Sequence, residues 1–115
     1  TTYNSRGGVI MNNKFNGWKN WETYCFYSSI TNEESDYEYA LEMAFDSEHE
    51  YELSKRLEEW AEEMAEDVLS SYEYAHKFIE SILDDSIRMV NFYEVAEHLW
   101  ETRQEAIKEH DGEEE

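Results

Sequence analysis

The sequence contains no proline, four glycines and a single cysteine among its 115 residues. One cysteine, Cys25, excludes an internal disulfide framework and a zinc site built from cysteines, and it fits a reducing compartment. No apolar run approaches the roughly 20 residues that cross a bilayer, and the N-terminus lacks the apolar core of a signal peptide. No linker divides the chain, so we expect one folded domain in the cytoplasm.

Basic residues are also scarce. Nine Lys and Arg stand against 29 Asp and Glu, which gives a net charge of −20. Three of the nine bases precede the first acid, Glu22, so the segment from Trp21 onward carries a charge of −23. Such a field repels nucleic acids and anionic membranes and attracts cationic proteins. We therefore predict a basic protein as the partner, with no direct binding to nucleic acid or membrane.

The hydrophobic pattern predicts an all-α fold, a compact bundle of four to five helices. Aromatic residues make up 16% of the chain, which is enough to build a packed interior and too many for a disordered acidic tail. Three glycines and little periodicity in residues 1–17 indicate a flexible N-terminal arm. A single helical domain is predicted over 18–110, followed by an acidic tail over 111–115.

Capping residues predict where the helices start. A Ser or Asn with Glu three positions later satisfies free backbone N–H groups at a helix start, and an Asn with Thr at that position serves similarly. The predicted caps are Asn20, Ser35, Ser47, Ser70 and Asn91. Residues 24–30 are also rich in strand-prone aromatics, which leaves a strand there as the alternative. The helix from Tyr72 to about Val90 has an apolar stripe at Ala75, Phe78, Ile79, Ile82 and Leu83 and is expected to be the most buried.

The stretch Ser47–Leu69 predicts an amphipathic helix with nine acids against one Lys and one Arg. Its apolar face would contain Leu53, Leu57, Trp60, Ala61, Met64, Ala65 and Val68. Like charges three or four residues apart destabilise a helix by roughly 0.2–0.5 kcal/mol per pair. Stability alone would favour a mixture of acidic and basic residues on this face. The alternative interpretation is that the acids form an ordinary solvated helix face without a binding role. We interpret the acids as a partner-binding surface formed by Glu52, Glu59, Glu62, Glu63 and Glu66.

A second acidic row is predicted on the last helix. The inner face of that helix would contain Phe92, Val95, Ala96, Leu99, Trp100 and Ile107. Its outer face carries acids at four-residue intervals, about 6 Å apart along the axis, at Glu97, Glu101, Glu105 and Glu109. We expect both acidic rows to form one continuous surface whose charge density approaches that of duplex DNA. Candidate aromatic anchors for the partner are Tyr51, Tyr72 and Tyr74.

Catalytic and metal-binding patterns are weak. Glu73-x-x-His76 has the spacing used by di-iron sites in helical bundles, and Asp46-x-x-His49 is a degraded second copy, but no two further core glutamates accompany them. Cys25 has no recognisable catalytic partner, and the chain has no glycine-rich phosphate loop. We predict no metal, no cofactor and no enzymatic activity. A metalloprotein built around Glu73 and His76 is the alternative.

Two short motifs resemble a family of small proteins encoded by phages and plasmids. Residues 17–23, Gly-Trp-Lys-Asn-Trp-Glu-Thr, resemble its Gly-Trp-Thr/Ser-Asn-Tyr/Trp-Glu-Thr-Trp signature, with departures at Lys19 and Tyr24. Residues 90–96, Val-Asn-Phe-Tyr-Glu-Val-Ala, resemble its C-terminal Val-Asn-Trp-x-x-Ile-Ala pattern. The resemblance implies a mobile-element origin but no established reaction.

In size and charge the chain is also similar to phage proteins that mimic DNA. We predict a phage-encoded anti-defence inhibitor, either anti-CRISPR or anti-restriction, in the host cytoplasm. It would act as an acidic DNA mimic on the nucleic-acid-binding surface of a basic host protein, a CRISPR effector or a restriction enzyme. The alternative is a non-mimic phage interaction protein that inhibits its target allosterically or forms a homodimer.

Overall fold

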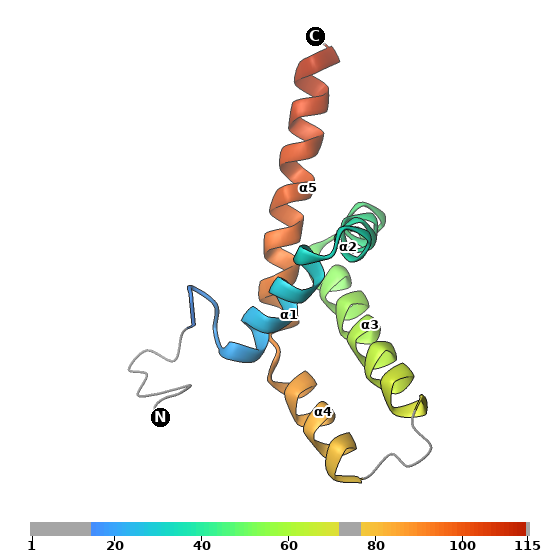
Figure 1. The fold of residues 1–115 in the computed structure, drawn as a ribbon. Coiled ribbons are helices and arrows are strands. Elements are labelled where there is room, and N and C mark those ends of the chain that lie inside the picture. Colours follow the sequence, from blue (N-terminus) through green and yellow to red (C-terminus); the bar gives the residue numbers. More distant parts are fainter. Residues whose placement is uncertain (1–14, 72–76, 115) are drawn as a thin grey trace.

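The computed structural model describes residues 15–71 and 77–114, which form five α-helices (Figure 1). The helices are α1 Trp21–Asn32, α2 Glu34–Asp46, α3 Glu50–Ser70, α4 Lys77–Met89 and α5 Phe92–Glu114. The predicted all-α fold of four to five helices is confirmed. Residues 24–30 lie within α1, so the strand considered there is wrong.

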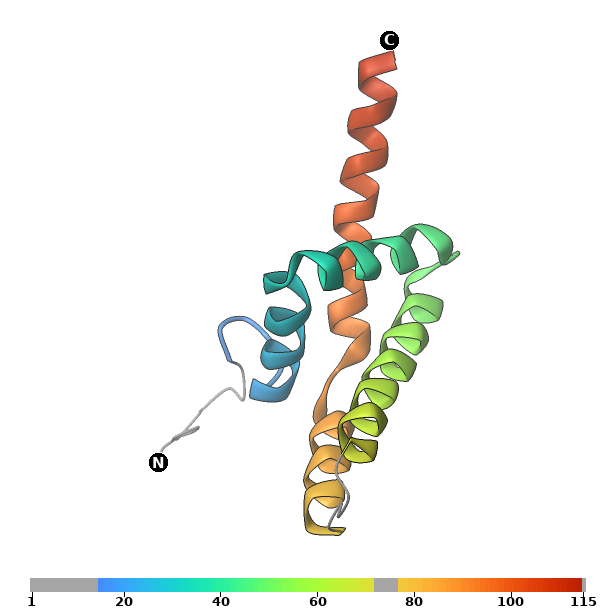
Figure 2. The same ribbon diagram turned by 45° about the vertical axis from the view of Figure 1, so that its right-hand side comes forward.

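The helices meet at a centre where the first parts of α3 and α5 pack against each other, which is the most extensive helix contact. Figures 1 and 2 both show α3 and α5 leaving this centre in opposite directions, and the end of α5 projecting beyond the other helices. α4 packs beside α3. α5 continues to Glu114, so the helix includes most of the predicted tail 111–115.

The core lies at this centre. Its buried apolar side chains are Trp18, Ile30, Ala40, Met43, Ala44, Leu53, Leu57, Ala61, Phe92, Val95, Ala96 and Leu99. The predicted inner face of α5 is buried at four of its six positions and that of α3 at three of its seven, and Trp60 and Trp100 pack against this core. Both faces end earlier than the sequence pattern suggests, because Val68 and Ile107 lie beyond the packed centre and are exposed.

Two asparagine caps are confirmed, and a buried threonine joins them. The backbone N–H of Thr23 donates to Asn20 Oδ1 at 2.9 Å, and that of Glu94 donates to Asn91 Oδ1 at 3.1 Å. The Thr23 hydroxyl donates to Asn20 Oδ1 at 2.6 Å and accepts from the Asn91 N–H at 2.8 Å. The starts of α1 and α5 are thereby held together.

Two serine caps are wrong. Ser35 lies in the first turn of α2, which is capped by the Glu33 carboxylate through the Ser35 N–H at 3.1 Å. Ser47 is buried at the end of α2 and donates its hydroxyl to the carbonyl oxygen four residues earlier at 2.8 Å. α3 is capped instead by His49, whose Nδ1 accepts from the Glu52 N–H at 3.2 Å.

The expectation that the fourth helix is the most buried is also wrong. None of the described residues of α4 is buried, and Phe78 is 72% exposed. The predicted cap Ser70 is the last residue of α3, and the predicted start at Tyr72 lies outside the described residues. Phe78, Ile79 and Ile82, which the pattern predicted to face inward, are exposed, because among the described helices α4 packs beside α3 and α1 alone.

Part of the predicted N-terminal arm forms a defined turn. Phe15 and Trp18 exchange two backbone hydrogen bonds of 2.7 Å. Between them Gly17 has a φ of +87°, a conformation that favours glycine. The Phe15 ring packs edge-on against Trp21 with 4.7 Å between the ring centroids. The turn therefore belongs to the domain, while residues 1–14 of the predicted arm 1–17 lie outside the described part.

Candidate partner-binding surface

The outer half of α3, residues 58–70, carries six acids and no Lys or Arg. Four of the predicted partner-binding residues belong to it, and the structure leaves all four exposed: Glu59, Glu62, Glu63 and Glu66. They occupy the side of the helix away from the buried residues Leu57 and Ala61. We call these four residues the α3 acidic surface.

The fifth predicted residue of this group, Glu52, has a local role. Its carboxylate accepts the Glu48 N–H at 2.7 Å and lies 3.3 Å from the Arg56 guanidinium. The backbone hydrogen bond from Glu48, followed by the interaction with Arg56, lowers the pKa of Glu52. Glu52 therefore closes the first turn of α3, and its charge is offset before a partner approaches.

The predicted row on α5 is exposed at all four positions, Glu97, Glu101, Glu105 and Glu109. We call it the α5 ladder. Arg103 does not offset it, because the guanidinium carbon lies 4.4 Å from the Trp100 ring centroid and 5.6 Å from that of Phe45. Arg103 thus belongs to the inner stripe of α5, opposite the ladder. Lys108 is the nearest base in the sequence on the ladder side of the helix.

The two acidic rows do not form the single continuous surface that we expected. α3 and α5 face each other through their buried residues, so the acids on their outer sides point away from each other. The two helices also run in opposite directions from the core, which separates the outer half of α3 from the end of α5 (Figures 1 and 2). The two predicted rows are therefore separate acidic surfaces.

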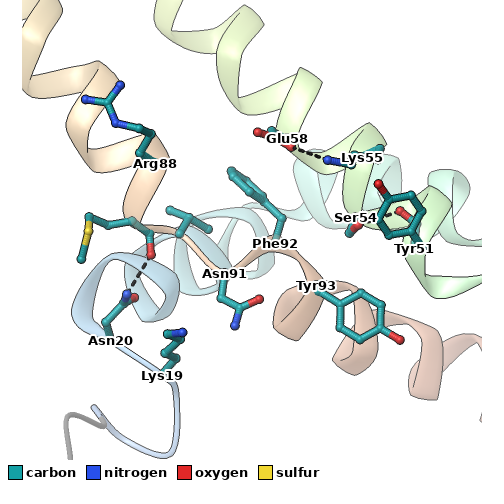
Figure 3. Close-up of a pocket in the computed structure, with 12 residues that line it drawn as sticks. Lys19, Asn20, Tyr51, Ser54, Lys55, Glu58, Arg88, Asn91, Phe92 and Tyr93 are labelled. Atoms are coloured by element: carbon teal, nitrogen blue, oxygen red, sulfur yellow. Dashed lines mark hydrogen bonds and ion pairs between the residues drawn. The ribbon is translucent and has the colours of Figure 1, made fainter.

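Basic residues gather elsewhere, around a cleft of about 670 Å³ between α3, α4 and the starts of α1 and α5 (Figure 3). Lys19, Lys55 and Arg88 line this cleft. Lys55 Nζ lies 3.6 Å from the Glu58 carboxylate, and Arg88 pairs with Asp85. Because acids offset two of its three bases, the cleft is a mixed-charge region and not a strong anion site.

Tyr51, a predicted anchor, lines the same cleft and is 59% exposed. Its ring lies 5.4 Å from Lys55 Nζ, which places it beside a base of its own chain. The other two predicted anchors, Tyr72 and Tyr74, lie outside the described residues. An aromatic contact to a partner is thus available at Tyr51, about three turns before Glu62 on the same side of α3.

The predicted metal alternative falls largely outside the described part, which omits both Glu73 and His76. His49 of the second copy is the cap of α3. Within residues 15–71 and 77–114, no group of three or more His, Cys, Asp or Glu side chains is arranged to hold a metal ion. Cys25 is half-buried in α1.

Comparison with known proteins adds no relative. No family model, curated protein or solved structure matches the chain. Among the described helices, none is both long and apolar enough to cross a membrane. The resemblance to phage and plasmid proteins therefore stays a prediction.

Proposed function

We propose that the protein is an anti-defence inhibitor of phage origin that binds the nucleic-acid-binding surface of a basic host protein in place of DNA. The observation that carries the proposal is the outer half of α3, where six acids follow one another without a Lys or Arg. A CRISPR effector or a restriction enzyme in the host cytoplasm is the target that we propose. Inhibition is by occlusion, without catalysis, metal or cofactor.

The charge spacing of the outer half of α3 suits this role. Its 13 residues extend about 20 Å, which gives one acid per roughly 3.3 Å of axis. A single DNA strand carries one phosphate per about 3.4 Å. Arg and Lys side chains that contact a phosphate backbone would meet carboxylates at a similar interval, so the outer half of α3 resembles one DNA strand more than a whole duplex.

Because the two acidic rows are separate, we propose that only one of them contacts the partner directly. A partner groove that receives the α3 acidic surface faces away from the α5 ladder, so the ladder contributes mainly through the long-range field of the molecule. That field accelerates the encounter with a basic partner and weakens as salt rises. Direct contact therefore depends on α3, whereas both rows contribute to the association rate.

A non-mimic interaction protein is the second candidate, and the exposed apolar residues of α4 favour it. Such a protein would inhibit its target allosterically or act as a homodimer. A homodimer has to bring two chains of charge −20 together, and self-repulsion of this size opposes association. A basic partner is therefore a better fit than a second copy of this chain to the exposed apolar residues of α4.

A pair of matched variants tests the proposal. One changes Glu59, Glu62, Glu63 and Glu66 to Gln, and the other changes Glu97, Glu101, Glu105 and Glu109 to Gln, so each removes the same charge from a different face. Each protein is immobilised, exposed to bacterial lysate, and eluted first with a short DNA duplex and then with high salt. Mass spectrometry identifies the eluted proteins.

The wild-type protein is expected to capture nucleic-acid-binding proteins that the DNA duplex releases. The α3 variant should lose this fraction, and the α5 variant should retain most of it with a reduced association rate. Mimicry is excluded if the α3 variant captures the same DNA-eluted proteins as the wild type. It is also excluded if the captured proteins are neutral and unaffected by DNA.

A further inference from the structure

An apolar groove of about 550 Å³ opens between α1, α3 and α4. Side chains from all three helices form its walls, chiefly Trp21, Phe26, Met64, Val68, Leu83 and Ile87. The sequence alone does not reveal this groove, because its pattern predicts that the fourth helix is the most buried one. The walls come from separate helices, so only their packing brings them together.

Exposed apolar side chains form part of the groove walls and also precede the groove-lining residues on α4. Val68 and Trp21 on its walls are 48% and 42% exposed. On α4, Phe78, Ile79 and Ile82 are exposed and lie one to five residues before the lining residue Leu83. Large exposed apolar patches mark interaction surfaces. The groove and the exposed apolar residues beside it are therefore a candidate interaction surface.

The charged residues that line the groove and border it on α3 are acidic, which favours a basic partner. Among the described residues that line it there is no Lys, Arg or His, and the one charged residue is Glu22. On α3, the exposed Glu62 borders the edge of the lined face, next to Ala61 and Ala65. An apolar floor with an acidic rim is complementary to an apolar stripe flanked by Lys and Arg.

We infer that this groove receives an amphipathic helix of the partner protein, with an apolar stripe seated against α1, α3 and α4 and Lys or Arg on its flanks. Amphipathic helices bind apolar grooves through side chains at i, i+3, i+4 and i+7. A second copy of this chain would bring a net charge of −20 to the same acidic rim, which opposes self-association. The inference rests on the proposed function, because the partner is the same basic protein.

Three synthetic helical peptides probe the groove. The first has a Leu and Phe stripe at i, i+3, i+4 and i+7 with Lys on both flanks. The second has the same stripe with Glu on its flanks, and the third is a scrambled form of the first with no stripe. Fluorescence anisotropy of labelled peptides measures binding to the full chain.

A matched pair of substitutions locates the binding site. Ser86 lies on the groove wall and is exposed, so Ser86→Trp fills the groove. Ser81 is an exposed residue of the same helix that does not line the groove, and Ser81→Trp is the control. Both changes are made at the surface of α4, so the fold should tolerate them. Circular dichroism confirms that helicity is retained.

The Lys-flanked amphipathic peptide is expected to bind about tenfold or more tightly than either other peptide, and Ser86→Trp should weaken it about tenfold while Ser81→Trp changes it less than about twofold. Equal binding of the scrambled peptide would overturn the inference, because charge alone would then explain it. An unchanged affinity in Ser86→Trp would also overturn it.

Two other occupants are outcomes of the same test. A dimer in sedimentation that Ser86→Trp dissociates would assign the groove to a second copy. A variant without residues 1–14 that binds the peptide about tenfold more tightly would assign it to the chain's own N-terminal segment. Either result overturns the inference.

The lysate experiment separates this inference from the proposed function. If Ser86→Trp still captures DNA-eluted proteins, the proposed function stands even when the groove inference fails. If the wild-type protein binds the peptide but captures no DNA-eluted proteins, only the DNA mimicry is excluded.

Discussion

The two halves of α3 differ in both burial and charge. The inner half, residues 50–57, contains three buried residues, and its two bases equal its two acids. Lys55 and Arg56 each pair with an acid of the same helix. The outer half, residues 58–70, has one buried residue, Ala61, and a charge of −6. One continuous helix is thus neutral where it is packed and strongly acidic where it leaves the core.

The charges of the inner half stabilise the helix, whereas those of the outer half destabilise it. Repulsion among carboxylates costs roughly 0.2–0.5 kcal/mol for each like-charged pair on a helix face. The cost falls on the half that has the fewest buried contacts to offset it. Mixed charges in the outer half would stabilise the domain, so the fold itself does not require the acids there, which supports the binding role proposed for them.

The largest effect is expected from truncation in the inner half. Leu57 is fully buried, so Leu57→Ala should lower the free energy of unfolding by about 2–5 kcal/mol through lost burial and a cavity. Val68→Ala in the outer half should cost less than about 1 kcal/mol, because that side chain is half exposed. Urea unfolding followed by circular dichroism measures both. Equal losses would show that the outer half is as tightly packed as the inner half.

The next effect concerns the hydrogen bonds that close the core around the starts of α1 and α5. Thr23→Val keeps the buried shape but leaves the Asn91 N–H without its acceptor, which should cost about 1–3 kcal/mol. Thr31→Val is the control, because the Thr31 hydroxyl bonds only to carbonyls of its own helix. Thermal unfolding compares the two. A cost no greater than that of the control would contradict the role of Thr23.

A smaller effect of opposite sign is expected in the outer half. Glu62→Lys replaces repulsion with Glu58, Glu59 and Glu66 by attraction, which should raise the free energy of unfolding by about 0.5–1 kcal/mol. Lys55→Glu in the inner half removes the pair with Glu58 and should lower it. The same urea titration detects both changes. A destabilised Glu62→Lys variant would show that the acids serve the fold.

The smallest effect is the pH dependence of the start of α3. The backbone N–H of Glu48, and then Arg56, hold the pKa of Glu52 below its ordinary value of 4.5. Because the folded pKa lies below the unfolded one, Glu52 stabilises the fold above the unfolded pKa, and this contribution is lost as pH falls through the folded pKa. Glu52→Gln should therefore flatten the loss of stability on acidification below about pH 4.5.

Glu42→Gln is the control for that prediction, because it removes the same charge from an exposed site on α2. Melting temperatures measured between neutral pH and acid compare the two variants with the wild type. If the two acid profiles coincide, the contacts of Glu52 contribute nothing specific. A flatter profile for Glu52→Gln alone would assign the effect to the first turn of α3.

Local sequence signals were reliable where the interaction itself is local. Asn20 and Asn91 are caps because an Asn side chain reaches an N–H two or three residues ahead whatever surrounds it. The Ser47 cap is wrong because the Ser47 hydroxyl donates to a carbonyl of the preceding helix instead of accepting from an N–H of α3. At the candidate surface, the four predicted acids of the outer half are exposed, whereas Glu52 is engaged by its neighbours.

The sequence by itself determined the helices, the charge and the two acidic rows, because periodicity and helical rise place residues on a face without reference to the rest of the chain. Tertiary structure decided how those faces are used. It turned the α3 acidic surface and the α5 ladder away from each other, since both helices bury their opposite sides in one core. It also left the apolar residues Leu83 and Ile87 of α4 lining an open groove. A stripe has the same pattern whether or not another helix covers it.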